Sequence, residues 1–126
     1  MAYIGWLLSA EDRASLLKKF EPAYSDVIAH HITFSQDTKL ALPDVKKFEV
    51  VGIADDLNGV QALVIALDGN TARTNGRHYH ITWSIDRAKG CKPVDSNAVI
   101  AAEGWVDVDK ISITCTPFNS ATDTVL

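Results

Sequence analysis

A short internal repeat constrains this chain more than any other feature of its sequence. Residues 31–35 read His-Ile-Thr-Phe-Ser, and residues 80–84, 49 positions later, read His-Ile-Thr-Trp-Ser. Because side chains alternate across a β-strand, the His, Thr and Ser of each copy share one face, and the Ile and the aromatic residue share the other. Each copy therefore predicts a strand with an apolar face in the core and a polar face that borders a cleft.

Two histidines that face one cleft can supply both halves of general acid–base catalysis. Near neutral pH an imidazole can accept a proton and an imidazolium can donate one. We expect His31 and His80 to hold these two catalytic roles. The hydroxyls of Thr33 and Thr82 lie two residues along each strand. They are expected to donate to the phosphate oxygens on which charge collects in the transition state. Such a site requires no metal ion.

The twin His-x-Thr motifs resemble those of the two-histidine (2H) phosphoesterase superfamily, which includes cyclic phosphodiesterases and 2′–5′ RNA ligase-like proteins. The resemblance implies a duplicated α+β unit that encloses a cleft. It implies that His31 and His80 act as acid and base and that Thr33 and Thr82 bind phosphate. The implied reaction is hydrolysis of a cyclic phosphodiester without a cofactor, and which histidine is the base stays open.

Four further polar residues are candidates for substrate binding. Arg73 and Arg77 belong to a polar stretch just before the second motif, where a guanidinium can reach a phosphate or a nucleobase. Ser35 and Ser84 end the two motifs and share the strand face of the histidines. The same alternation predicts that His30 faces away from His31.

Charge limits the size of the substrate. The formal net charge is −4, and the basic residues form no run. Proteins that grip long DNA or RNA carry a basic patch or stripe, because they neutralise many phosphates. We therefore expect a mononucleotide, a dinucleotide or a short, cyclic oligonucleotide as the partner, and no long nucleic acid.

The pattern along the chain predicts a single α+β domain, residues 1–126, with a mainly antiparallel sheet, about two helices on one face, and pseudo-duplicated β-α-β units around a cleft. The turn signal at residues 56–59 predicts a hairpin. A capping box at Ser9 begins the first helix, and Asp95 with Ser96 caps the second. Strands are expected over residues 3–8, 27–35, 48–54, 60–67 and 78–86, and residues 105–117 are expected to form one or two closing strands. Helices are expected over residues 10–20 and 97–103.

The chain reads as a soluble, cytoplasmic protein. Its first residues lack the basic start of a signal peptide, and no apolar run approaches the length of a membrane span. Cys91 and Cys115 lie far apart in sequence and form no metal-binding or disulfide pattern. We expect two reduced thiols and no membrane partner.

Two other readings compete with the phosphodiesterase. One is a non-catalytic nucleotide-binding module that keeps the cleft, although such a module would not need both His-x-Thr copies. The other is a cupin-like metal protein, because His78 and His80 form a His-x-His pair on one strand face. The residues that follow, 81–84, supply no carboxylate ligand, which weakens the metal reading.

Overall fold

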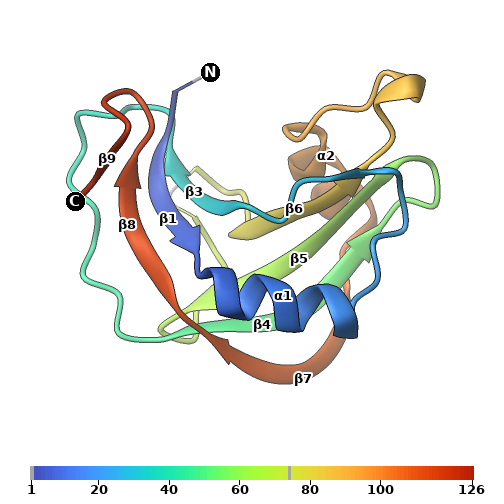
Figure 1. The fold of residues 1–126 in the computed structure, drawn as a ribbon, viewed down its shortest axis with the longest axis horizontal. Coiled ribbons are helices and arrows are strands. Elements are labelled where there is room, and N and C mark those ends of the chain that lie inside the picture. Colours follow the sequence, from blue (N-terminus) through green and yellow to red (C-terminus); the bar gives the residue numbers. More distant parts are fainter. Residues whose placement is uncertain (1, 74) are drawn as a thin grey trace.

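The computed structural model describes residues 2–73 and 75–126. Within them the chain forms one α+β domain with two α-helices and two antiparallel sheets, as predicted (Figure 1). The helices are α1 (Ala10–Lys19) and α2 (Asp95–Glu103), and a 3₁₀ turn spans Arg87–Lys89. The first sheet has the order β3-β1-β8-β9, with β1 (Ile4–Leu8), β3 (His31–Ser35), β8 (Cys115–Asn119) and β9 (Thr124–Val125). The second has the order β2-β6-β5-β4-β7, with β2 (Asp26–Val27), β4 (Phe48–Asp55), β5 (Val60–Leu67), β6 (His80–Ile85) and β7 (Val106–Ile113).

The main core lies between the two sheets. Ile32 of the first motif and Trp83 of the second are fully buried there, as alternation predicts. Trp6 of β1 packs edge-on against Phe34 and Tyr79, which come from the two halves of the chain. The apolar faces of both motif strands therefore meet in one core, and this contact fixes the two sheets relative to each other.

The helices lie on opposite faces of the five-stranded sheet, so the expectation that they share one face is wrong. Leu16 of α1 belongs to the main core together with Leu63 of β5. Ile100 of α2 packs in a second cluster with Val64, the next residue of β5. Adjacent residues of a strand point to opposite faces, so each face of β5 takes one helix. Every residue of β5 is buried, which agrees with packing on both faces of this strand.

Local signals explain the helix starts only in part. The Ser9 hydroxyl caps α1 by accepting from the backbone N–H of Asp12, as predicted. The second helix begins at Asp95, two residues earlier than expected, and its cap residue, Val94, makes no side-chain hydrogen bond. The Asp95 carboxylate accepts instead from the backbone N–H of Lys92, so it holds the preceding turn. The predicted hairpin is confirmed by the pairing of β4 with β5.

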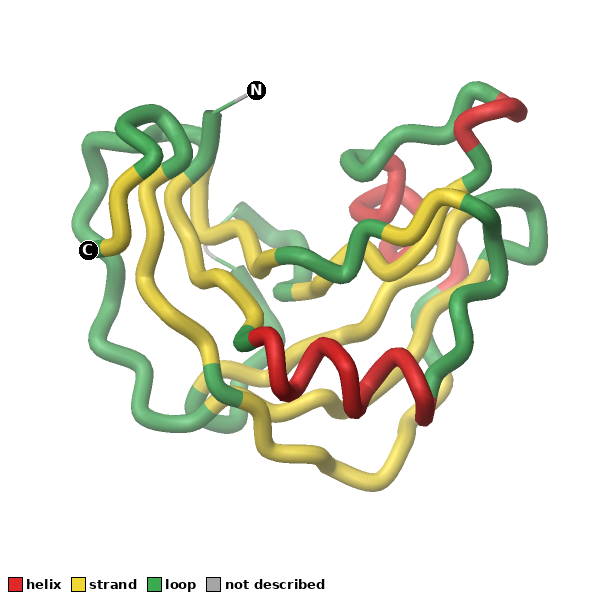
Figure 2. Tube along the Cα trace, viewed as in Figure 1, coloured by secondary structure: helices red, strands yellow, loops and turns green. Residues whose placement is uncertain are grey.

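The expected strand over residues 27–35 is broken into two strands of different sheets. β2 pairs with β6, whereas β3 pairs with β1 (Figure 2). Between them Ala29 has a φ of 46°, a left-handed conformation that a non-glycine residue rarely adopts. The chain turns at Ala29 and crosses from one sheet to the other, which an uninterrupted strand could not do.

No helix among the described residues is long and apolar enough to cross a membrane.

Candidate active site

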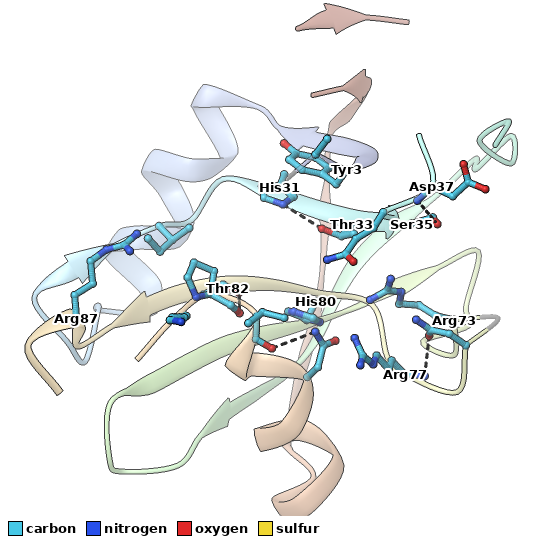
Figure 3. Close-up of a pocket in the computed structure, with 18 residues that line it drawn as sticks. Tyr3, His31, Thr33, Ser35, Asp37, Arg73, Arg77, His80, Thr82 and Arg87 are labelled. Atoms are coloured by element: carbon cyan, nitrogen blue, oxygen red, sulfur yellow. Dashed lines mark hydrogen bonds between the residues drawn. The ribbon is translucent and has the colours of Figure 1, made fainter. Parts of the chain in front are cut away.

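A cavity of about 750 Å³ opens between the two motif strands. Figure 3 shows His31 and Thr33 on one side of it and His80 and Thr82 on the other, with Arg73 and Arg77 at one end and Arg87 at the opposite end. The residues of its wall come from both sheets, from the loop before β6 and from the start of α2: Ala2, Tyr3, Ile28, His31, Thr33, Ser35, Gln36, Asp37, Arg73, Asn75, Arg77, His80, Thr82, Arg87, Lys92, Pro93, Val94 and Asn97.

The turn at Ala29 creates this opening. The backbone N–H of Ala29 donates to the carbonyl of Thr82, so the chain still runs beside β6 at that residue. Two residues later His31 has joined the other sheet, where it pairs with Leu7 of β1. The two motif strands thus start side by side and then separate, and the polar face of each borders the widening gap.

His80 is held as a proton acceptor. Its Nδ1 lies 2.9 Å from the carbonyl oxygen of His78, and because a carbonyl can only accept, Nδ1 must carry a proton. The neutral ring therefore keeps its lone pair on Nε2. Burial lowers the pKa of His80, and the charges of Arg73 and Arg77 lower it further against the opposing effect of this hydrogen bond. The neutral, basic form is the one that the site favours.

His31, on the opposite side of the cavity, is also largely buried. Its Nε2 lies 3.1 Å from the Thr33 hydroxyl, and its ring stacks on the ring of Tyr3. Burial lowers the pKa of His31 to about 4, with smaller contributions from the charges of His30 and His80. His31 is therefore neutral near pH 7 in the empty site, and a general acid there needs a further source of its proton.

His30 does not face away from His31, contrary to the prediction. Its Nδ1 lies 3.0 Å from Nδ1 of His31. The alternation rule fails because β3 begins at His31, so His30 belongs to the turn after Ala29 and not to the strand. The two adjacent rings consequently form a hydrogen-bonded pair.

The two threonines of the repeat lie in different surroundings. The Thr33 hydroxyl bonds only with the His31 ring among the described residues and borders the cavity. The Thr82 hydroxyl donates to the carbonyl of Pro93 and therefore accepts from the Ser96 hydroxyl, 2.9 Å away. Thr82 lines the cavity but its proton is already committed, so the predicted role of a phosphate donor holds no geometric support there. It ties β6 to the start of α2.

Arg73 is the main charge of the cavity. Its side chain is 9% exposed and donates to the carbonyl of Phe34 from Nη2. Its Nε is buried without a partner, and no carboxylate within the described ranges forms an ion pair with it. Burial lowers its pKa, and the charge of Arg77 adds to that effect. A buried guanidinium without an anionic partner is costly, so this position is suited to an anion that arrives with the ligand.

The two serines of the repeat also lie in different surroundings. Ser35 lines the cavity, and its hydroxyl accepts from the backbone N–H of Asp37. Ser84 is fully buried outside the cavity wall and donates to Gln61, so its predicted contact with substrate is wrong. The cause is a register shift between β5 and β6, where Gln61 pairs with Ser84 but Ala62 pairs with Thr82. The extra residue turns Ser84 off the cleft face.

Several wall residues carry no motif and were not singled out as site residues. Tyr3 reaches the site because β1 pairs with β3, and Asn97 because α2 begins beside β6. Arg87 adds positive charge at the end opposite Arg73. Lys92 is a further basic residue of the wall, and Asp37 is its acidic residue. Long-range strand pairing places these residues, and only the polar start of the second helix gave a signal in the sequence.

The His-x-His pair does not converge. The His78 ring packs edge-on against Trp105 and bonds with the Thr71 hydroxyl. His80 faces the cavity, whose wall does not include His78. No group of three or more His, Cys, Asp or Glu suited to a metal ion occurs in the described part of the chain.

Comparison of the chain with protein-family models, with curated proteins and with solved structures gives no match. The chemistry of the site is therefore read from its own geometry.

Proposed function

We propose that this chain is a metal-independent phosphodiesterase that hydrolyses a cyclic phosphodiester of a small nucleotide or a short, possibly cyclic, oligonucleotide. The observation that carries the proposal is the convergence of His31 and His80, from separate sheets, on one cavity that also holds the guanidinium of Arg73, which has no anionic partner among the described residues. The pattern of two proton-transfer groups around an anion site is what cleavage of a phosphodiester needs.

We give the two histidines different roles, and their hydrogen bonds support this choice. His80, with its proton held on Nδ1, takes a proton from water through Nε2 as the water oxygen attacks phosphorus. His31 gives a proton to the leaving ring oxygen as its bond to phosphorus breaks. Arg73 and the Thr33 hydroxyl face the remaining phosphate oxygens, where negative charge develops. The product is an opened phosphomonoester.

The size and charge of the cavity support a small substrate. A volume of about 750 Å³ lies within the range of roughly 300–1,000 Å³ of small-molecule sites. The positive residues Arg73, Arg77, Arg87 and Lys92 gather at the cavity, although the whole chain has a net charge of −4. We place the activity in the cytoplasm, which the free thiols of Cys91 and Cys115 support.

A non-catalytic nucleotide-binding module is the second candidate. The lowered pKa of His31 favours this candidate. A neutral imidazole can bind a ligand, but at pH 7 it lacks the additional proton that a general acid gives up. In that case the cavity binds the same class of ligand without turnover.

The test is a panel of 2′,3′-cyclic, 3′,5′-cyclic and cyclic dinucleotide substrates assayed with EDTA present. We expect turnover of at least one class, and a loss of about 10²–10⁴-fold in His31→Ala and in His80→Ala with the fold intact by circular dichroism. Binding without turnover would favour the module.

A matched variant separates the metal reading. His78→Gln removes the second histidine of the His-x-His pair but keeps its backbone carbonyl, and its side chain lies against Trp105. The phosphodiesterase should retain its activity in this variant. Loss of activity both in His78→Gln and on chelation, with recovery on adding zinc or manganese, would refute metal independence.

A further inference from the structure

A chain of hydrogen-bonding groups runs from the protein surface to the catalytic cavity through His30 and His31. The exposed His30 ring places its Nδ1 3.0 Å from Nδ1 of His31. On the other side of the His31 ring, Nε2 lies 3.1 Å from Thr33 in the cavity wall. Two imidazole nitrogens at hydrogen-bond distance must share one proton, so when Nδ1 of one ring carries it, Nδ1 of the other ring must accept it.

We propose that His30 is a positioning residue that keeps the catalytic proton in water and delivers it through His31 to the leaving oxygen of the substrate. This inference rests on the proposed function, in which His31 is the general acid. It assigns a role to a residue outside the His-x-Thr repeat. His30 also lies outside the cavity wall, so it acts through His31.

The proton balance is simple. Before the reaction His30 is an imidazolium that donates from Nδ1 to Nδ1 of His31, and neutral His31 carries its proton on Nε2. As the bond from phosphorus to the leaving oxygen breaks, the Nε2 proton moves to that oxygen and the proton of His30 moves to Nδ1 of His31. Both rings end neutral, and His30 regains a proton from solvent.

The surroundings of the pair explain why the charge belongs on the outer ring. The Tyr3 ring, just before β1, stacks on His31, and burial together with the neighbouring His80 ring on β6 opposes a charge on His31. His30 is exposed, although Arg13 of α1 donates to the adjacent carbonyl of Ala29. A cation in water avoids the desolvation that a buried one suffers.

The test compares His30→Gln and His30→Ala with the wild-type protein. The glutamine amide can still donate a hydrogen bond to His31 but cannot release a proton. We expect kcat to fall by about 10²-fold, the size of a lost proton-transfer role, with KM nearly unchanged. Added imidazole should restore kcat in His30→Ala, where the ring is missing, but not in His30→Gln.

The pH profile separates the relay from a simple charge effect. With His30 absent, His31 must hold the proton itself, so the alkaline limb of kcat should move to lower pH, toward the pKa of about 4 of His31. Removing only the repulsion of the His30 charge would raise that pKa and move the limb upward. An unchanged limb, or an upward shift, would overturn the relay.

A control and a second readout keep the two proposals apart. Lys39→Gln removes an exposed cation and should leave kcat and the profile unchanged. Nitrogen-15 NMR of the rings should show His30 taking up the proton before His31, independently of any substrate. If no substrate is turned over, the proposed function fails, and if His31 is protonated first, the relay fails alone.

Discussion

The ring of Tyr3 lies flat on the imidazole of His31, with ring centroids 3.8 Å apart and planes only 9° apart. The Tyr3 backbone N–H donates to the Ser120 hydroxyl, which fixes the residue ahead of β1. The stack restrains rotation of the His31 ring away from Thr33. Tyr3 therefore holds His31 in the orientation that the proposed reaction uses.

Replacing Tyr3 tests this restraint with a matched pair of variants. The buried Tyr3 hydroxyl has no hydrogen-bond partner in the described part of the chain, so Tyr3→Phe should keep the stack, the stability and kcat within about threefold. Tyr3→Ala should lower kcat by about tenfold or more while the protein stays folded, because the ring of His31 is freed. Equal kcat values for the two variants, from steady-state kinetics, would show that the stack has no role.

The two threonines should respond differently to the same substitution. Thr33→Val removes a hydroxyl that faces the cavity and should lower kcat by about 10-fold or more with little change in stability. Thr82→Val breaks the bond to Pro93 and leaves the buried Ser96 hydroxyl without its acceptor, so the free energy of unfolding should fall by about 1–3 kcal/mol. Urea denaturation together with kinetics separates the two effects, and identical behaviour would contradict the asymmetry.

The sequence predicted those parts of the site that depend on local periodicity. Alternation within each repeat correctly placed Ile32 and Trp83 in the core and the two histidines at the cleft. It also predicted an α+β fold, because the strand and helix signals are local and several of them are strong. These inferences need nothing beyond the side-chain period of a strand and the chemistry of a helix cap.

What the sequence could not show depends on non-local pairing. No glycine in the sequence indicates the left-handed turn at Ala29, yet this turn separates β2 from β3 and opens the cleft. The register shift that buries Ser84 arises from its pairing with β5, and the stacking of Tyr3 arises from the pairing of β1 with β3. Each residue is placed by a partner strand far away in the chain.

Arg73→Met should separate stability from function. The guanidinium is buried and has no anionic partner among the described residues, so an apolar side chain of similar length should leave the melting temperature unchanged or raise it. The affinity for the substrate phosphate should fall, and kcat/KM should drop by about 10²-fold. Calorimetry and kinetics on the same preparation test both parts, and a large loss of stability would mean that Arg73 is a structural residue.

The stability of the protein should fall as the pH is lowered from about 6.5 to about 4. In the unfolded chain a histidine has a pKa near 6.5, whereas burial lowers the pKa of His31 to about 4 and lowers that of His80 as well. Between these pH values the unfolded state binds more protons than the folded state, so the free energy of unfolding rises with pH. Each such proton contributes a slope of about 1.4 kcal/mol per pH unit.

Carboxylates also weaken folded proteins in acid, so the comparison must isolate the histidine. Urea titrations between pH 4.5 and 7 give the slope of the unfolding free energy against pH. In His31→Asn we expect this slope to be lower by up to about 1.4 kcal/mol per pH unit, which is the contribution of one proton. If His31→Asn shows the wild-type slope, His31 is not buried in its neutral form, and the need for a proton from His30 disappears with it.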